Sequence, residues 1–191
     1  YLQVPLERWS AGLFVHYRIS EETEIYAELS FANNRSENRL PSVPGGGVLT
    51  VNLDNPLLTP ATQALLADNF AVGENLAAFP YGRRFSEVGP RITGRNRDYW
   101  RGIFGLRGKV WGDWDYDAWL GLTDANERER FVNDVSRSRL AQGVLVDPAT
   151  GGCVDPSGGC VPVNPFGAGN ITPEAADFLR ISGVENTTER T

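Results

Sequence analysis

The chain has 191 residues, 41% of them hydrophobic, and a formal net charge of −6 at pH 7. This acidic balance argues against a general nucleic-acid binder, whose binding surface would be basic. The sequence has no apolar run of about 18 residues and so no candidate transmembrane helix. Strands that cross a membrane would not appear as such a run.

The first residues, YLQVPLERW, have neither the basic start nor the apolar segment of a signal peptide. We therefore expect either that the mature chain starts here or that the sequence is a segment of a longer one.

Residues 8–33 predict a first β-hairpin, because successive strand residues point to opposite faces of a sheet. We call each set of alternate residues in a strand a parity. In the first arm the alternate residues from Trp9 to Ile19 are apolar, and in the second arm the apolar parity includes Leu29. A short polar turn joins the two arms. The opposite parity carries the ionisable side chains of this hairpin: His16, Arg18, Glu24 and Glu28.

Residues 97–131 predict a second hairpin, with arms at 99–111 and 114–124 around a Trp-Gly-Asp-Trp turn. Each arm is close to the roughly 9–11 residues that a tilted strand needs to cross a bilayer. Aromatic residues stand at the arm ends, where a membrane interface favours them. The same pattern also fits a long hairpin of a soluble β protein. The polar parity carries Arg101, Arg107, Lys109, Asp115 and Asp117.

Opposite charges on the polar parity predict cross-strand pairs within each hairpin. Arg107 and Lys109 are expected opposite Asp115 and Asp117, as His16 and Arg18 are opposite Glu24 and Glu28. Such pairs stabilise a sheet by roughly 0.2–1 kcal/mol each. The apolar parity is nearly free of charge in all four arms, which matters because one Arg or Lys at the membrane midplane costs about 2–4 kcal/mol.

Two long connections, 34–96 and 132–191, follow the hairpins. We expect helices that begin after Thr59 and Thr172, the second ending near Ile181, and a short helix near 136–142. An extended strand is expected within 81–96, and ERER at 127–130 fits either a strand or a helical turn. Compact domains rarely carry connections beyond about 12–15 residues. Short turns on one side and long connections on the other are typical of outer-membrane barrels.

Cys153 and Cys160 lie in a loop rich in Gly and Pro, a pattern that favours a disulfide and an oxidising compartment. Free thiols and a metal site are the alternatives, and a metal site would need further ligands. His16 is the only histidine. We therefore expect no metal ion and no other cofactor.

The residues that would carry enzymatic chemistry do not form a recognisable set. No serine stands in a nucleophile-elbow pattern, and the aspartates at 113, 115 and 117 lack the glycine and glutamate spacing of an EF-hand. The Gly45–Gly47 run lacks the Lys-Ser/Thr of a phosphate loop. We expect that the chain is not an enzyme.

Five segments together resemble the barrel portion of TonB-dependent outer-membrane receptors: ERWSAGLFVHYRISEETEIYAELSFANN, NPLLTPATQALLA, RRFSEVGPR, YWRGIFGLRGKVWGDWDYDAWLG and VPVNPFGAGNITPEA. The resemblance implies a mainly β fold, with antiparallel hairpins from a 22-stranded transmembrane barrel and long extracellular loops that carry short helices. The hairpins 8–33 and 97–131 and the loops 34–96 and 132–191 would then be parts of one barrel domain, with the ionic parity facing its plugged lumen.

The resemblance also implies a function, which is active uptake of a scarce nutrient across the outer membrane of a Gram-negative bacterium. The partners would be outer-membrane lipid, a small-molecule ligand (siderophore-bound iron, a cobalamin or an oligosaccharide) and the TonB complex. The TonB box, the plug and the last strand are missing from this sequence, so this chain alone is not expected to transport.

In such a receptor the loops would form part of the ligand vestibule. The residues expected to stack on or pair with a ligand are Phe79, Tyr81, Phe85, Phe166, Arg83 and Arg84. The alternative is that the aromatic residues pack the loops together and that the arginines are solvated. For the whole chain, a soluble or surface-exposed β-rich binding or adhesion module and a glycan-active enzyme are the alternatives.

Overall fold

The computed structural model describes residues 4–112 and 114–191. Asp113, in the expected second turn, and the first three residues of the chain lie outside the described residues. The fold is mainly β, with antiparallel sheets, and it divides into two compact units. The sheet unit comprises Tyr1–Asn38, Thr93–Arg130 and Gly183–Thr191, and the loop unit comprises Arg39–Ile92 and Phe131–Ser182.

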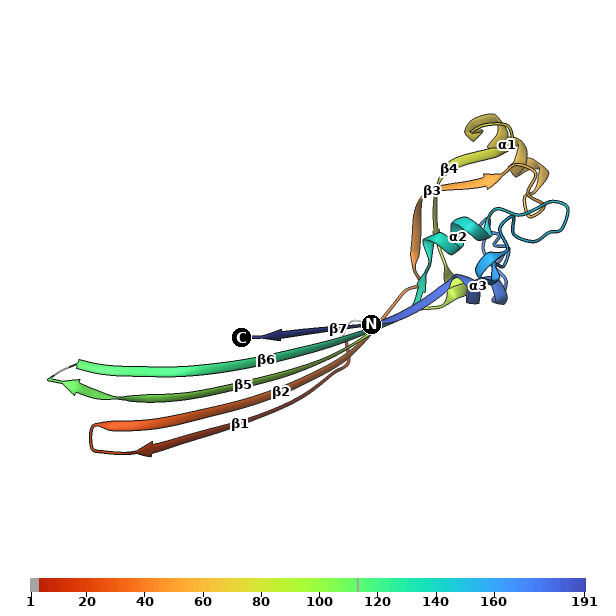
Figure 1. Ribbon diagram of the computed structural model, residues 1–191. Coiled ribbons are helices and arrows are strands. Elements are labelled where there is room, and N and C mark those ends of the chain that lie inside the picture. Colours follow the sequence, from red (N-terminus) through yellow and green to blue (C-terminus); the bar gives the residue numbers. More distant parts are fainter. Residues whose placement is uncertain (1–3, 113) are drawn as a thin grey trace. The chain divides into compact units, whose positions relative to one another are not determined.

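Five strands form one sheet in the order β1-β2-β5-β6-β7, as Figure 1 shows. β1 and β2 are antiparallel, with register from Leu6 opposite Ser36 to Arg18 opposite Glu24. Among the described residues the sheet is open, with β1 and β7 at its edges. The strand bounds are β1 Leu6–Arg18, β2 Thr23–Leu40, β5 Arg91–Trp111, β6 Trp114–Val135 and β7 Arg180–Arg190.

The strands are longer than the sequence predicts. β5 has 21 residues and β6 has 22, because polar side chains continue the pairing beyond the apolar segments. Asn33 donates to Asp98 at 2.6 Å, and Arg97 pairs with Glu127 at 2.5 Å. The segment 127–130 is therefore strand and not a helical turn.

Two parts of the expected connections were predicted wrongly. The sequence predicts a loop where β7 lies, because RISGVENTTER carries polar residues on both parities. β7 lies beside β6 in the sheet, and Thr191, the residue after β7, exchanges two backbone hydrogen bonds with Thr123 of β6. The expected extended strand within 81–96 is interrupted by a short 3-10 helix, η1 Ser86–Val88. Gly89 follows it with φ 99°, which turns the chain before β5 begins.

The loop unit contains a second, antiparallel sheet of β3 Pro44–Asn52 and β4 Leu76–Arg84. This hairpin was not predicted, and a Gly-rich start hides its strand pattern. The helices are α1 Pro60–Phe70, α2 Arg137–Gly143 and α3 Pro173–Leu179, with a second 3-10 helix, η2 Ser157–Gly159. None of the helices that the structure describes is both long enough and apolar enough to cross a membrane.

The three expected helix starts are confirmed. Thr59, Ser136 and Thr172 each accept a hydrogen bond from a backbone N–H three residues later, the standard N-cap contact. Proline follows both threonines at the first helical position, where its missing N–H costs nothing. α3 ends at Leu179, slightly earlier than predicted.

Both long connections contribute to a single hydrophobic core in the loop unit. Residues before β5 and residues after β6 are buried together, so the connections form one folded body. The largest fully buried side chains are Phe85, Leu179, Val51, Val88, Val144, Val146 and Val163.

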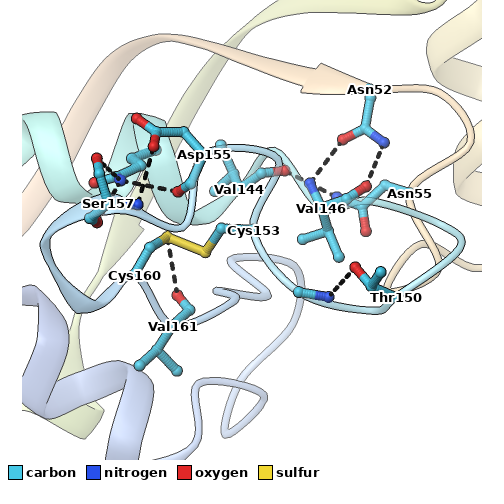
Figure 2. Close-up of a disulfide and its surroundings, with 12 residues drawn as sticks. Asn52, Asn55, Val144, Val146, Thr150, Cys153, Asp155, Ser157, Cys160 and Val161 are labelled. Atoms are coloured by element: carbon cyan, nitrogen blue, oxygen red, sulfur yellow. Dashed lines mark hydrogen bonds between the residues drawn. A yellow bond between two sulfur atoms is a disulfide. The ribbon is translucent and has the colours of Figure 1, made fainter.

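Two buried asparagines join the connections, as Figure 2 shows. Asn52 donates to the carbonyl of Val146 at 2.7 Å and accepts from its N–H at 3.0 Å. Asn55 donates to the carbonyl of Val144 at 2.9 Å. The same loop carries a disulfide between Cys153 and Cys160, whose Cα atoms are 6.2 Å apart.

Candidate functional site

One face of the sheet unit is apolar and uncovered. Tyr26 is the only hydrophobic side chain of this unit that is buried among the described residues, so the sheet has no core of its own. A sheet of this size normally packs its apolar face against another layer. Within the strands, the exposed large side chains on the apolar parity are Trp9, Leu13, Val15, Tyr17, Leu29, Trp100, Phe104, Val110, Trp114, Leu120 and Leu122. We call this set the apolar band.

Aromatic side chains stand at both ends of the apolar band. At one end the rings of Phe31 and Trp100 lie 4.4 Å apart, and at the other Tyr116 reaches Thr23. The stretch from Thr23 to Phe31 matches the roughly 9–11 residues that cross a bilayer. Trp9 lies two residues further along, opposite Asn33, and beyond this pair the strands carry mainly polar residues on both faces, which limits the length of the band.

The opposite face holds a connected polar network. Glu24 accepts from Arg107 at 2.6 Å and lies 3.0 Å from the imidazole of His16. The Arg107 guanidinium lies over the ring of Tyr26, 5.3 Å from its centroid, and Tyr26 donates to Asp117 at 2.8 Å. Side chains from four strands thus meet on one face.

The ionic residues expected on this face are only partly paired as predicted. Arg107 pairs with Glu24 across the two hairpins instead of with Asp115 or Asp117 inside its own hairpin, because β5 lies beside β2. Glu28 and Arg101 form no ion pair with a described residue. Arg18, Lys109 and Asp115 line the same hollow as Glu24, Arg107 and Asp117.

Aromatic rings cover glycines on the ionic face of the sheet. This explains why aromatic side chains stand among the charged ones there. A Cβ added at Gly105 would stand 2.2 Å from the ring of Tyr26. Similar approaches join Gly12 to Phe14 and Gly121 to Trp119, at 3.2 and 3.1 Å. Aromatic cover of a strand glycine restores packing that the missing side chain would otherwise lose.

The loop unit contains a cleft of about 480 Å³ between β4 and the segment 165–168. This volume lies within the roughly 300–1,000 Å³ of small-molecule sites. Five of the six residues expected to meet a ligand line it: Phe79, Tyr81, Arg83, Arg84 and Phe166. We call it the Tyr81 cleft.

The cleft lies where glycines replace larger residues on one face of β3. Leu49 opposes Phe79 in the core, but the next pairs on the same face are Gly47 with Tyr81 and Gly45 with Arg83. A Cβ added at Gly47 would meet nothing within 4 Å, so the space beside Tyr81 is open. The rings of Phe79 and Phe166, 5.6 Å apart, form the adjoining wall.

Arg83 ties the two walls of the cleft together. It pairs with Glu87 at 2.7 Å and donates to the carbonyl of Pro165 at 2.7 Å. Burial raises the pKa of Glu87, but hydrogen bonds from its own N–H and from Gly169, together with the charge of Arg83, outweigh this and hold the pKa below its usual value. Glu87 is therefore ionised and neutralises Arg83.

Two of the expected ligand residues have other surroundings. Phe85 is fully buried and lies against Gly45, where an added Cβ would stand 2.3 Å from its ring; it has no surface to offer a ligand. Arg84 contributes to the lining of the cleft, but it is exposed. It follows Arg83 on the strand, so its side chain points to the opposite face and donates to the carbonyl of Ser42 at 2.8 Å. Nothing in the sequence pattern singles out Glu87, which lies four residues beyond Arg83 in η1, where the sequence predicts an extended strand.

Comparisons with protein-family models, curated proteins and solved structures find no match for this chain. Among the described residues no three His, Cys, Asp or Glu side chains gather as a metal site would require.

Proposed function

We propose that this chain is a segment of a TonB-dependent outer-membrane receptor, a 22-stranded barrel that takes up a scarce nutrient in a Gram-negative bacterium. The five strands of the sheet unit are part of the barrel wall. The loop unit is part of the extracellular ligand vestibule. Coupling to the TonB complex would depend on parts of the receptor outside this sequence.

The observation that carries the proposal is the uncovered apolar band opposite an ionic network. Leu13, Leu29, Phe104 and Leu120 are each more than half exposed, at 56%, 53%, 60% and 71%. In water so large an exposed apolar surface is unfavourable, whereas hydrocarbon removes that cost. The band also has the length of a membrane span and aromatic residues at both ends.

The chain order supports the same proposal. The short turns after β1 and β5 lie at one end of the sheet, since the N–H of Lys109 donates to the carbonyl of Glu22 at 3.0 Å. The long connections start from the other strand ends. This asymmetry is that of barrels with short periplasmic turns and long outer loops. The open edges of β1 and β7 would pair with further strands of the barrel.

A pair of adjacent substitutions in the complete gene product tests the proposal. Phe104→Arg places a charge on the apolar band, at a cost of about 2–4 kcal/mol near the membrane midplane, whereas Ile103→Arg places it on the ionic face. We expect Phe104→Arg alone to reduce folded receptor in the outer membrane, measured by fractionation and by heat-dependent gel mobility. Equal tolerance of both substitutions would favour a soluble or surface-exposed β-rich binding module.

A further inference from the structure

We propose that the Tyr81 cleft binds one ring of a neutral saccharide, which stacks on the Tyr81 phenol and forms hydrogen bonds at the Arg83–Glu87 end. This inference rests on the proposed function, because it names the class of nutrient that the vestibule takes. It narrows the expectation that these aromatic residues and arginines stack on or pair with a ligand.

The Arg83–Glu87 end of the cleft disfavours an anionic ligand. Arg83 is neutralised by Glu87 at 2.7 Å, and both side chains are nearly buried, with 12% and 13% exposed. Arg84 also lines the cleft, but its side chain is exposed and donates to the carbonyl of Ser42, so its charge stays in contact with water. A carboxylate or phosphate at the Arg83–Glu87 end would lose its hydration without gaining a free cation there, and that loss is costly.

The chemistry of the walls matches a ligand with an apolar face and a hydroxylated edge. Phe79, Phe166 and Tyr81 supply aromatic surface, and the Tyr81 hydroxyl has no hydrogen-bond partner among the described residues. Small-molecule sites combine such aromatic walls with a few fixed polar groups. A pyranose ring presents C–H groups on its faces and hydroxyls around its edge, so it satisfies both parts of the cleft.

The cleft is also rigid before a ligand arrives. Arg83 joins β4 to Pro165, and Glu87 accepts from the N–H of Gly169 at 2.9 Å. The following loop is braced by Asn164, which accepts from the N–H of Phe166 at 3.0 Å. A preformed site avoids the entropic cost of ordering loops on binding, and this favours recognition of a weakly interacting neutral ligand.

Ligand-observed saturation-transfer NMR tests the inference on the complete gene product in a detergent without a sugar headgroup. The probes are maltose, cellobiose, sucrose and lactose, with benzoate and glucuronate as anionic comparisons. We expect at least one neutral disaccharide to bind and the anions not to bind. Tyr81→Ala should weaken saccharide binding roughly ten-fold, because it removes one stacking surface, while Tyr81→Phe should keep most of it.

Two further variants locate the binding. Ala168→Trp fills the cleft from its exposed rim and should abolish binding. Val48→Ala, on the outer face of β3 and 72% exposed, should leave it unchanged. Preferential binding of benzoate or glucuronate, binding that survives Ala168→Trp, or no binding of any disaccharide would overturn the inference. Membrane insertion is measured on the same preparations, so loss of the barrel is distinguished from failure of the saccharide assignment.

Discussion

Arg107 on β5 donates to Glu24 on β2 with 2.6 Å between Nη2 and Oε1, although the two residues lie 83 positions apart in the sequence. The contact joins the two hairpins on the ionic face, while Phe31 and Trp100 join them on the apolar face. The relative register of the hairpins is therefore held from both sides of the sheet.

The Arg107–Glu24 pair is expected to make a small, salt-dependent contribution. Its side chains are 48% and 22% exposed, and exposed pairs contribute about 0.2–1 kcal/mol, which salt screens. A double-mutant cycle with Arg107→Leu and Glu24→Gln should give a coupling of that size in urea unfolding of the vesicle-embedded protein. Arg101→Leu, which removes no ion pair within the part of the chain that the structure describes, is the control. A coupling unchanged between low and high salt would contradict this reading.

Gly105→Ala is expected to destabilise the sheet by about 1–3 kcal/mol, the usual cost of an overpacked site. The new Cβ would collide with the ring of Tyr26 and displace the hydroxyl that donates to Asp117 at 2.8 Å. Adding Tyr26→Ala should remove most of the penalty of the alanine. Gly94→Ala is the matched control on the same strand, because nothing lies within 4 Å of its added Cβ. Equal unfolding midpoints for the two single variants would show that the Tyr26 ring does not require a glycine.

Asn52→Leu is expected to loosen the loop unit. It removes both hydrogen bonds to Val146 and leaves a buried N–H and a buried carbonyl without partners, at roughly 1–3 kcal/mol each. Limited proteolysis should then cleave the segment after β6 faster than in the wild type. Asn69→Leu serves as control, since Asn69 is exposed and bonds only to the carbonyl of Leu65 in its own helix. Unchanged cleavage would mean that the two connections do not depend on Asn52 for their association.

The stability of the Tyr81 cleft and its affinity for a saccharide are expected to fall in acid. Because the pKa of Glu87 lies below its ordinary value of 4.5, its pairing with Arg83 contributes full stability above that value and loses it as the pH falls through the lowered pKa. Saccharide affinity should fall over the same range. Glu87→Gln should abolish this pH dependence and leave Arg83 with an uncompensated charge, so that glucuronate begins to bind. The same pH profile in both proteins would assign the titration to another group.

The sheet was predictable where one local pattern decides the structure. Alternation of apolar and ionic residues around Leu29 and Phe104 marks strands and their faces without knowledge of their neighbours. β7 lacks that alternation and is held by pairing with β6, as at Arg190, which bonds to Asp124. Such pairing is a tertiary contact that a single segment does not encode.

The cleft was predictable in its aromatic residues but not in its charge. Tyr81 and Phe166 stand out in the sequence as aromatic residues in loops. The neutralisation of Arg83 depends on a 3-10 turn that brings Glu87 back to it. The burial of Phe85 depends on Gly45 in the opposite strand, and the β3–β4 pairing itself was not visible in the sequence.

The most direct test of the membrane assignment is the accessibility of spin labels placed one by one along β5, from position 100 to 110, in lipid vesicles. The proposed barrel wall predicts high accessibility to lipid-dissolved oxygen at even positions such as Phe104. It predicts high accessibility to a water-soluble nickel chelate at odd positions such as Arg107, with a period of two residues. Equal accessibility of both parities to the nickel chelate would contradict it, because the apolar band would then face water.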